Sequence, residues 1–143
     1  MIKPITRRSV YVASAWVTGD KALEARDKLI RAGFDVTSRW LERVGVEVPA
    51  ACPGYDYTKD ANYMTNHARE ESLKDIEDVK RADAVVVVNL AKSEGKAVET
   101  GLAIAFGIPV IVVGEKSNTF HSLSAPAMRV VSTVEDAIEL LRD

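Results

Sequence analysis

Two kinds of hydrophobic pattern alternate along the chain, short β-branched runs and repeats at helical spacing. Ser9–Ala15 is rich in valine and predicts a strand, and Asp35–Trp40 predicts a second strand from a weaker alternation. Between them, alanine and leucine recur at helical spacing over Lys21–Ala32, with Asp20 placed to cap the helix and Gly33 placed to end it. The chain therefore opens as strand, helix, strand.

The second half of the chain continues the same alternation. Ala84–Asn89 is an unbroken β-branched run, which is typical of a strand buried on both faces. Further strands are predicted at Pro109–Gly114 and Met128–Val131. Helices are predicted at Ala68–Arg81, Ala97–Phe106 and Val134–Leu141, the last beginning after Thr133. This order indicates a single α/β domain over residues 1–143: an open, doubly wound, flavodoxin- or Rossmann-like parallel sheet of five strands with helices on both faces.

Two segments carry more specific expectations. In the helix at Ala68–Arg81, Leu73, Ile76 and Val79 recur every three residues and are expected to face the core. Residues 41–66 contain prolines, glycines and tyrosines without any period, which favours an irregular flap over the site, with part of it a short helix. Ligands of open parallel sheets bind beyond the carboxyl ends of the strands, so we expect the chemistry in the segments that follow the strands.

Composition narrows the classes of function. The 143 residues carry a net charge of −2, which favours neither a general nucleic-acid surface nor a membrane surface. Cys52 is the single cysteine, so no intramolecular disulfide can form, which fits a reducing compartment. The stretch Met1–Arg8 lacks the pattern of a signal peptide, and no apolar run is long enough to span a bilayer. The sequence thus predicts a cytoplasmic protein without a membrane or nucleic-acid partner.

The sequence contains no pattern of metal ligands and no coenzyme motif. His67 and His121 are isolated from other ligand residues. Neither a Walker phosphate loop nor a dinucleotide-binding glycine motif occurs. We therefore expect no metal and no cofactor, and a small molecule as the substrate.

The segment SEGKAVETGLA follows the buried strand and opens the next predicted helix. Gly95 and Ala97 are small enough for a ligand to approach the backbone closely. Glu99 is expected in the first turn, where the helix dipole favours the carboxylate form that a nucleophile needs, although helix capping explains such a glutamate equally well. Asp75 and Asp78 lie one turn apart in the preceding helix, where charged residues usually face water. Composition and spacing alone leave the roles of all three acids open.

Three pieces in this order resemble the nucleoside 2-deoxyribosyltransferase superfamily, which includes the 2′-deoxynucleoside 5′-monophosphate N-glycosidases. They are SVYVASA, DIEDVKRADAVVVVN and SEGKAVETGLAIAFGIPVIVV, with the E-x-G-x-A core at residues 99–103. The resemblance implies that Glu99 attacks the anomeric carbon and that Asp75 contacts the base and takes part in proton transfer. It also implies that Tyr11 lines the site and that Ser93 binds the 5′ end of the sugar. The expected substrate-binding set is Tyr11, Ser14, Ser93, Gly95 and Ala97.

The implied chemistry is that of a retaining glycosidase, in which water resolves a glycosyl-enzyme in a hydrolase and a second base resolves it in a transferase. Ser93 stands where free-nucleoside transferases usually have an aspartate, and a neutral hydroxyl favours a substrate with a 5′-phosphate. Lys96 is close enough in sequence to add positive charge, or is solvated surface. The nearest branch in motif is therefore the monophosphate N-glycosidases. The alternatives are a transferase acting on free deoxynucleosides, a non-catalytic nucleotide sensor and a glycosidase of NAD-like dinucleotides.

The sequence also departs from the family pattern. Ala97 stands where relatives often have glycine, and Ala15–Val17 lacks the arginine of the monophosphate hydrolases. The match is poor after Gly114, a region that in the transferases lends residues to the neighbouring subunit's site, and Ser122 and Ser124 are the candidates there. These family features, with the apolar character of the helix that contains Ala97, predict a homodimer or a higher homo-oligomer.

Overall fold

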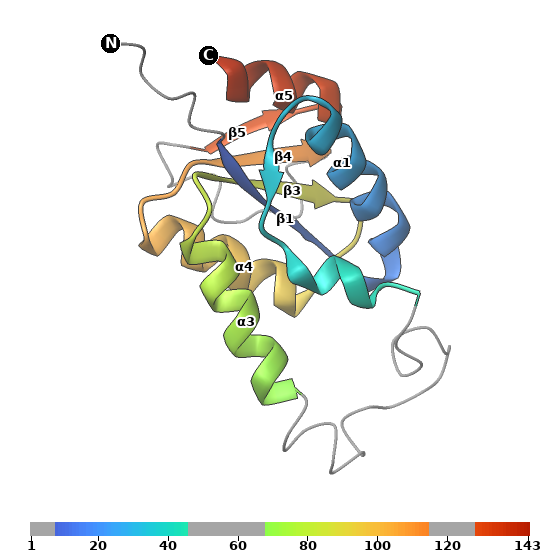
Figure 1. The fold of residues 1–143 in the computed structure, drawn as a ribbon, viewed down its shortest axis with the longest axis vertical. Helices are drawn as coiled ribbons and strands as arrows, with labels where there is room; N and C mark the ends of the chain where they lie inside the picture. Colours follow the sequence, from blue (N-terminus) through green and yellow to red (C-terminus); the bar gives the residue numbers. More distant parts are fainter. Residues whose placement is uncertain (1–7, 46–67, 115–127) are drawn as a thin grey trace.

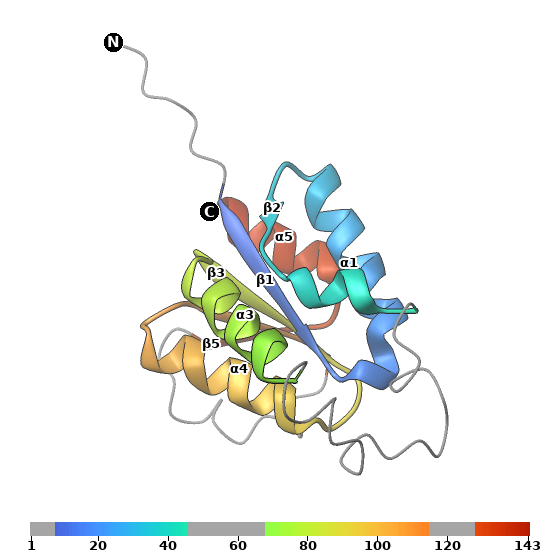
Figure 2. The same ribbon diagram turned by 60° about the horizontal axis from the view of Figure 1, so that its bottom comes forward.

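The computed structural model describes residues 8–45, 68–114 and 128–143, which form a five-stranded parallel sheet in the order β2-β1-β3-β4-β5 (Figure 1). Helices α1 and α5 cover one face of the sheet, and α3 and α4 cover the other (Figures 1 and 2). The elements are β1 Ser9–Ser14, η1 Trp16–Thr18, α1 Gly19–Arg31, β2 Asp35–Val36, η2 Arg39–Arg43, α3 Ala68–Lys80, β3 Ala84–Asn89, α4 Glu94–Ala105, β4 Val110–Gly114, β5 Met128–Val131 and α5 Val134–Arg142. The predicted α/β architecture is confirmed.

The central strand β3 organises the core. All six of its residues are buried, and Val86 lies between Val12 of β1 and Ile111 of β4. Branched side chains fit such a doubly covered strand because they pack on both faces of the pleat. This buried layer therefore holds β1 beside β3 in a fixed register, and β1 carries the candidate site residue Tyr11.

The prediction of a strand over Asp35–Trp40 is wrong beyond its first two residues. The chain turns away from the sheet there, and Arg39–Arg43 forms a 3₁₀ helix. Both backbone groups of Val12 bond to side chains at this turn: its N–H donates to Oγ of Ser38, and its carbonyl accepts from Nε1 of Trp40 at 2.9 Å. These side chains replace the ladder bonds that a longer strand would make.

The inward face of α3 differs from the prediction. Val79 is buried as expected, but Leu73 is 61% exposed and Ile76 is 39% exposed among the described residues. Asp78 is wholly buried instead, because partners on neighbouring elements satisfy its carboxylate. The polar contacts of Asp78 therefore determine which face of α3 is buried, and the spacing of hydrophobic residues does not predict those contacts.

Two helix starts also differ from the prediction. Thr18, and not Asp20, is the N-cap residue of α1, although it makes no side-chain capping bond. Helix α4 begins at Glu94, because the hydroxyl of Ser93 accepts a hydrogen bond from the backbone N–H of Lys96 and caps the helix there. The predicted cap of the last helix, Thr133, is confirmed by its bond from the N–H of Asp136.

Several predictions lie outside the described residues: those on most of the 41–66 segment, Cys52, His67, His121, Ser122 and Ser124. Within the described ranges, no helix is both long and apolar enough to cross a bilayer.

Candidate functional site

The sheet order reverses direction between β1 and β3, which makes the carboxyl ends of these two strands the expected ligand crevice. Tyr11 lies on β1, Asp75 on α3 and Glu99 on α4, and the three side chains interact electrostatically with one another. The structure therefore brings together three of the residues that the sequence singled out, from three separate elements.

Glu99 lies in the second turn of α4, not in the first, because the helix begins at Glu94. The stabilising effect of a helix dipole on a carboxylate fades after the first turn, so the predicted electrostatic origin of an ionised Glu99 is wrong. Burial raises the pKa of Glu99 to about 8, against the opposing influence of Tyr11, and the nearby Asp75 raises it further while Arg43 lowers it. This carboxyl therefore favours its protonated form at neutral pH.

The phenol of Tyr11 faces Glu99 from the core of the sheet. Its hydroxyl lies close enough to favour the ionised form of Glu99, yet the contact lacks the geometry of a formed hydrogen bond. The Tyr11 hydroxyl and Oε2 of Glu99 are thus buried atoms without a hydrogen-bond partner among the described residues. Burial raises the pKa of Tyr11 far above its ordinary value, so the phenol stays neutral and can act as a donor. Buried polar atoms left in this state are unusual, and they mark this contact as a candidate functional site.

Asp75 is the second carboxyl of the site. Burial raises its pKa to about 6, Arg43 and Arg39 lower it, and the carboxylates of Asp78 and Glu71 raise it. Its Oδ1 is buried without a hydrogen bond within the described structure, and its contact with Nη2 of Arg43 is a long ion pair of 3.8 Å. The side chain is therefore held loosely, with an oxygen available to a ligand.

Asp75 and Glu99 form a coupled pair whose two protons leave in steps. With pKa values raised to about 6 and about 8, the pair carries one proton across the neutral range. One carboxylate and one carboxylic acid side by side are what nucleophilic attack combined with general acid catalysis requires.

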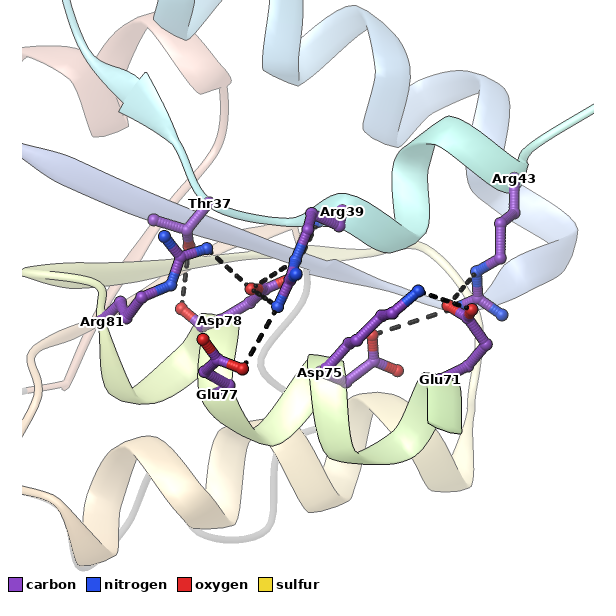
Figure 3. A network of polar contacts seen from close by, with 9 residues as sticks. Thr37, Arg39, Arg43, Glu71, Asp75, Glu77, Asp78 and Arg81 are labelled. Atoms are coloured by element: carbon purple, nitrogen blue, oxygen red, sulfur yellow. Dashed lines mark hydrogen bonds and ion pairs between the residues drawn. The ribbon is translucent and has the colours of Figure 1, made fainter. Parts of the chain in front are cut away.

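Arg43 is a member of the site that the sequence did not predict (Figure 3). Its Nε lies 3.2 Å from Oε2 of Glu71, its Nη2 lies 3.8 Å from Oδ1 of Asp75, and its guanidinium carbon lies 5.6 Å from the ring centroid of Trp16. Arg43 ends η2, in a part of the chain whose sequence has no period. No sequence signal would have identified it, because its partners come from elements distant in the chain.

Asp78 lies one turn along α3 from Asp75, in a cluster whose donors satisfy its carboxylate (Figure 3). Nε of Arg39 donates to Oδ1 at 2.9 Å, the backbone N–H of Arg39 donates to Oδ2 at 3.0 Å, and Nη2 of Arg81 donates to Oδ1 at 2.8 Å. Burial alone would raise the pKa of Asp78, but these hydrogen bonds hold it below its usual value. This ionised carboxylate ties η2 to α3 and has a structural role.

The remaining predicted residues lie around the turns that follow β1 and β3. Ser14 is buried, and its hydroxyl donates to the carbonyl of Ala15 at 2.8 Å and contacts Oγ1 of Thr18 at 2.9 Å. Gly95 and Ala97 are exposed on the first turns of α4. Ser14 therefore braces the turn after β1, whereas the other two leave the surface of α4 open.

Lys96 does not lie on solvated surface, which was one of the two alternatives. It is buried, and its ammonium bonds to Oδ1 of Asn89 and to the carbonyl of Ala91, while burial lowers its pKa. It holds the turn between β3 and α4 and thereby positions the capping residue Ser93. The described residues contain no cluster of three or more histidine, cysteine or acidic side chains that could hold a metal ion.

Comparison with known proteins identifies a shared fold. No protein-family model matches the sequence, and no curated protein matches it. Among solved structures, the chain is similar to the CMP N-glycosidase BcmB of Clostridium botulinum, with a TM-score of 0.51 and 15% sequence identity. The similarity covers 94% of this chain and 98% of that one. It establishes that the two chains share an α/β fold from end to end.

Proposed function

We propose that this protein is an N-glycosidase that cleaves the bond between base and sugar in a 2′-deoxynucleoside 5′-monophosphate, by way of a covalent glycosyl intermediate on Glu99. The observation that carries the proposal is the half-buried pair of Glu99 and Asp75, whose raised pKa values favour one shared proton near neutrality, beside the strands where the order reverses. Structural similarity to an enzyme that is named a CMP N-glycosidase supports the same class of reaction.

In the proposed reaction, the carboxylate of Glu99 attacks the anomeric carbon, and the bond to the base nitrogen breaks as Asp75 gives its proton to the base. Water then attacks the anomeric carbon and gives a proton to Asp75, and the bond to Glu99 breaks. The enzyme returns to its starting protonation state. The higher pKa of Glu99 places the shared proton on Glu99 in the resting pair, so this proton must pass to Asp75 before the attack. The attack then begins from an ionised Glu99, a form that the facing hydroxyl of Tyr11 favours.

The proposed 5′-phosphate is recognised at the start of α4. Oγ of Ser93 accepts the N–H of Lys96, so the proton of the Ser93 hydroxyl remains able to donate to a phosphate oxygen. The N-terminus of α4 adds unpaired backbone N–H groups and the positive end of the helix dipole. Both features favour an anion, whereas an aspartate at position 93 would repel it.

The test is to incubate the protein with ribo- and deoxynucleosides, their 5′-monophosphates, CMP included, and NAD, each with and without a second free base. The released and exchanged bases are measured by chromatography, and nucleotide binding is measured by calorimetry. We expect kcat/KM for the best monophosphate to exceed that for its free nucleoside by about 10-fold or more. Ser93→Asp keeps a good capping residue and should erase or reverse this preference. Thr133→Asp, which makes the same change at the cap of α5, is the matched control and should leave the preference intact.

Each outcome of this assay separates the alternatives. A preference for free nucleosides, with base exchange when a second base is added, would replace hydrolysis by transfer. Cleavage confined to NAD-like dinucleotides would replace the monophosphate by that substrate. Nucleotide binding without release of base from any substrate would overturn the enzyme proposal and leave a nucleotide sensor.

A further inference from the structure

Two acids of α3 compete for one arginine. Glu71 and Asp75 lie one helical turn apart and both contact Arg43 (Figure 3). The contact to Glu71 is 3.2 Å and that to Asp75 is 3.8 Å, so the closer pair forms with Glu71. All three side chains are largely shielded, with exposed fractions of 18% for Arg43, 16% for Glu71 and 25% for Asp75. At such positions a charge acts more strongly than on an open surface.

The arginine is held in this position from its other side. Its guanidinium lies over the ring of Trp16, whose centroid lies 6.0 Å from that of Trp40. Nε1 of Trp40 donates to the carbonyl of Val12 at 2.9 Å, which fixes this stack to β1. Lys74 contacts Glu71 at 3.2 Å from the solvent side, where its side chain is 45% exposed. Glu71 therefore lies between two cations, and Arg43 lies between Glu71 and a tryptophan.

The neighbouring aspartate shows what a closer arginine does. Asp78 receives Nη2 of Arg39 at 2.8 Å as well as further hydrogen bonds, and it is fixed as a carboxylate. If Arg43 closed on Asp75 in the same way, Asp75 would bind its proton too weakly to act as the acid of the proposed reaction.

We propose that Glu71 is a positioning residue that draws Arg43 away from Asp75 and so leaves Asp75 able to carry the catalytic proton. The role of Glu71 rests on the proposed function, because only that reaction needs a proton on Asp75. The contacts of Glu71 and Arg43 do not depend on the proposed function. The charged and titratable groups that interact with Asp75 are Arg43 and Arg39 from η2, Glu71 and Asp78 from α3, Glu99 from α4 and Tyr11 from β1. Among them, Glu71 and Arg43 contact each other, whereas Arg39 is paired with Asp78.

This arrangement predicts shifts of opposite sign when its two members are removed. Glu71→Gln removes a negative charge near Asp75 and releases Arg43 toward it, so both effects lower the pKa of Asp75. Arg43→Met removes a positive charge and keeps an unbranched side chain, so the pKa of Asp75 rises. A residue that merely supports the fold would not produce opposite shifts in folded variants.

The decisive experiment is a carboxyl NMR titration of Asp75 in the full-length protein, with the resonance assigned by its loss in Asp75→Asn. We expect the pKa of Asp75 to fall by about 0.5 or more in Glu71→Gln and to rise by about 0.5 or more in Arg43→Met. Lys74→Ala, which removes the outer cation alone, is the matched control and should move it by less than about 0.2. An unchanged or raised pKa in Glu71→Gln overturns the proposal.

The pH profile of base release adds a functional measurement. A reaction that needs protonated Asp75 loses rate as the pH rises through its pKa, so Glu71→Gln should move this alkaline limb to lower pH and reduce kcat with little change in KM. Glu71→Asp retains the charge and should restore the limb at least in part. If wild-type protein releases no base, the proposed function fails, while the NMR titration still decides the role of Glu71.

Discussion

Asp75 and Asp78 lie one turn apart on α3, and each faces an arginine from the same 3₁₀ helix, yet the two sites behave in opposite ways. Asp78 is the more deeply buried and has the lower pKa, because two arginines and a backbone N–H donate to it. Asp75 is the more exposed and has the higher pKa, because its partial burial raises the pKa, while Arg43 remains 3.8 Å away and Oδ1 lacks a hydrogen bond among the described residues. The number of donors, and not burial alone, separates the structural carboxylate from the reactive one.

The largest effect on turnover is expected from a substitution of Glu99, which lies in the region of the reactive carboxyl groups. Glu99→Gln keeps the shape of the side chain and removes the nucleophile, so turnover should fall by at least about 1,000-fold. Steady-state kinetics of base release, with circular dichroism to verify the fold, measure this effect. Glu94→Gln, at an exposed glutamate in the first turn of the same helix, is the control and should retain activity. Near-normal turnover of Glu99→Gln would exclude Glu99 as the nucleophile.

Asp75→Asn should lower turnover by about 100-fold or more, which is the usual scale for a lost general acid. Substrates with activated leaving bases need less help from an acid and should lose less. Comparing kcat for a natural and an activated base measures the difference. Equal losses for both would indicate that Asp75 orients the substrate and transfers no proton.

Asp78→Asn should act on stability. The variant leaves Arg39 and Arg81 without the carboxylate that joins them to α3, and the free energy of unfolding should fall by about 2 kcal/mol or more. Urea denaturation measures this change. In the same experiment, Asp75→Asn should lower the free energy of unfolding far less, because few contacts satisfy the carboxylate of Asp75. Similar losses for both variants would remove the distinction between the two aspartates.

The two regions should also contribute to stability with opposite pH dependence. The lowered pKa of Asp78 stabilises the fold above the ordinary pKa of an aspartate, and this contribution is lost as the pH falls through its folded value. The raised pKa values of Asp75 and Glu99 stabilise the fold below about pH 4, and this contribution is lost as the pH rises through about 6 and about 8. Glu99→Gln should therefore exceed wild type in unfolding free energy at pH 9, by about 2 kcal/mol. Equal stabilities at that pH would contradict the raised pKa of Glu99.

The smallest effect is expected for the exposed apolar residues on the outward face of α3, and it concerns the oligomeric state. Leu73 and Ile76 are exposed among the described residues, and we predict that such apolar surface joins copies of the chain into a homodimer or higher oligomer. Light scattering should give at least twice the 15.6 kDa mass, and Leu73→Glu should lower it. Ile30→Glu, at an exposed position of α1 on the other face of the sheet, is the control. An active wild-type monomer would refute the prediction.

The sequence predicted the fold well because its signals are local. The β-branched run of β3 and the helical spacing of α1 depend on neighbouring residues, and so does the cap at Thr133. The early end of β2 was missed because Trp40 bonds to β1 where the strand was expected to continue, which is a contact between distant segments. The exposed Leu73 was missed for the same reason, since a buried aspartate sets the rotation of α3.

The candidate site shows the same division. Family resemblance, and not periodicity, singled out Tyr11, Asp75 and Glu99, and the structure brings the three together. The protonation states were beyond the sequence, because they depend on burial and on a helix start that lies before Ala97. The sequence did not indicate Arg43 or Glu71, because neither residue belongs to a motif and their ion pair joins η2 to α3 across the fold.

The stack of Trp16 against Trp40 makes the protein its own optical reporter. The chain has two tryptophans, and both lie in this one stack beside Arg43, so all of the indole fluorescence comes from the edge of the candidate site. Movement of the arginine on ligand binding would change the polarity at Trp16 and hence the emission of the whole protein. The 6.0 Å separation of the two rings, tilted by 44°, also suits exciton coupling in circular dichroism. A nucleotide titration can thus be followed without any label.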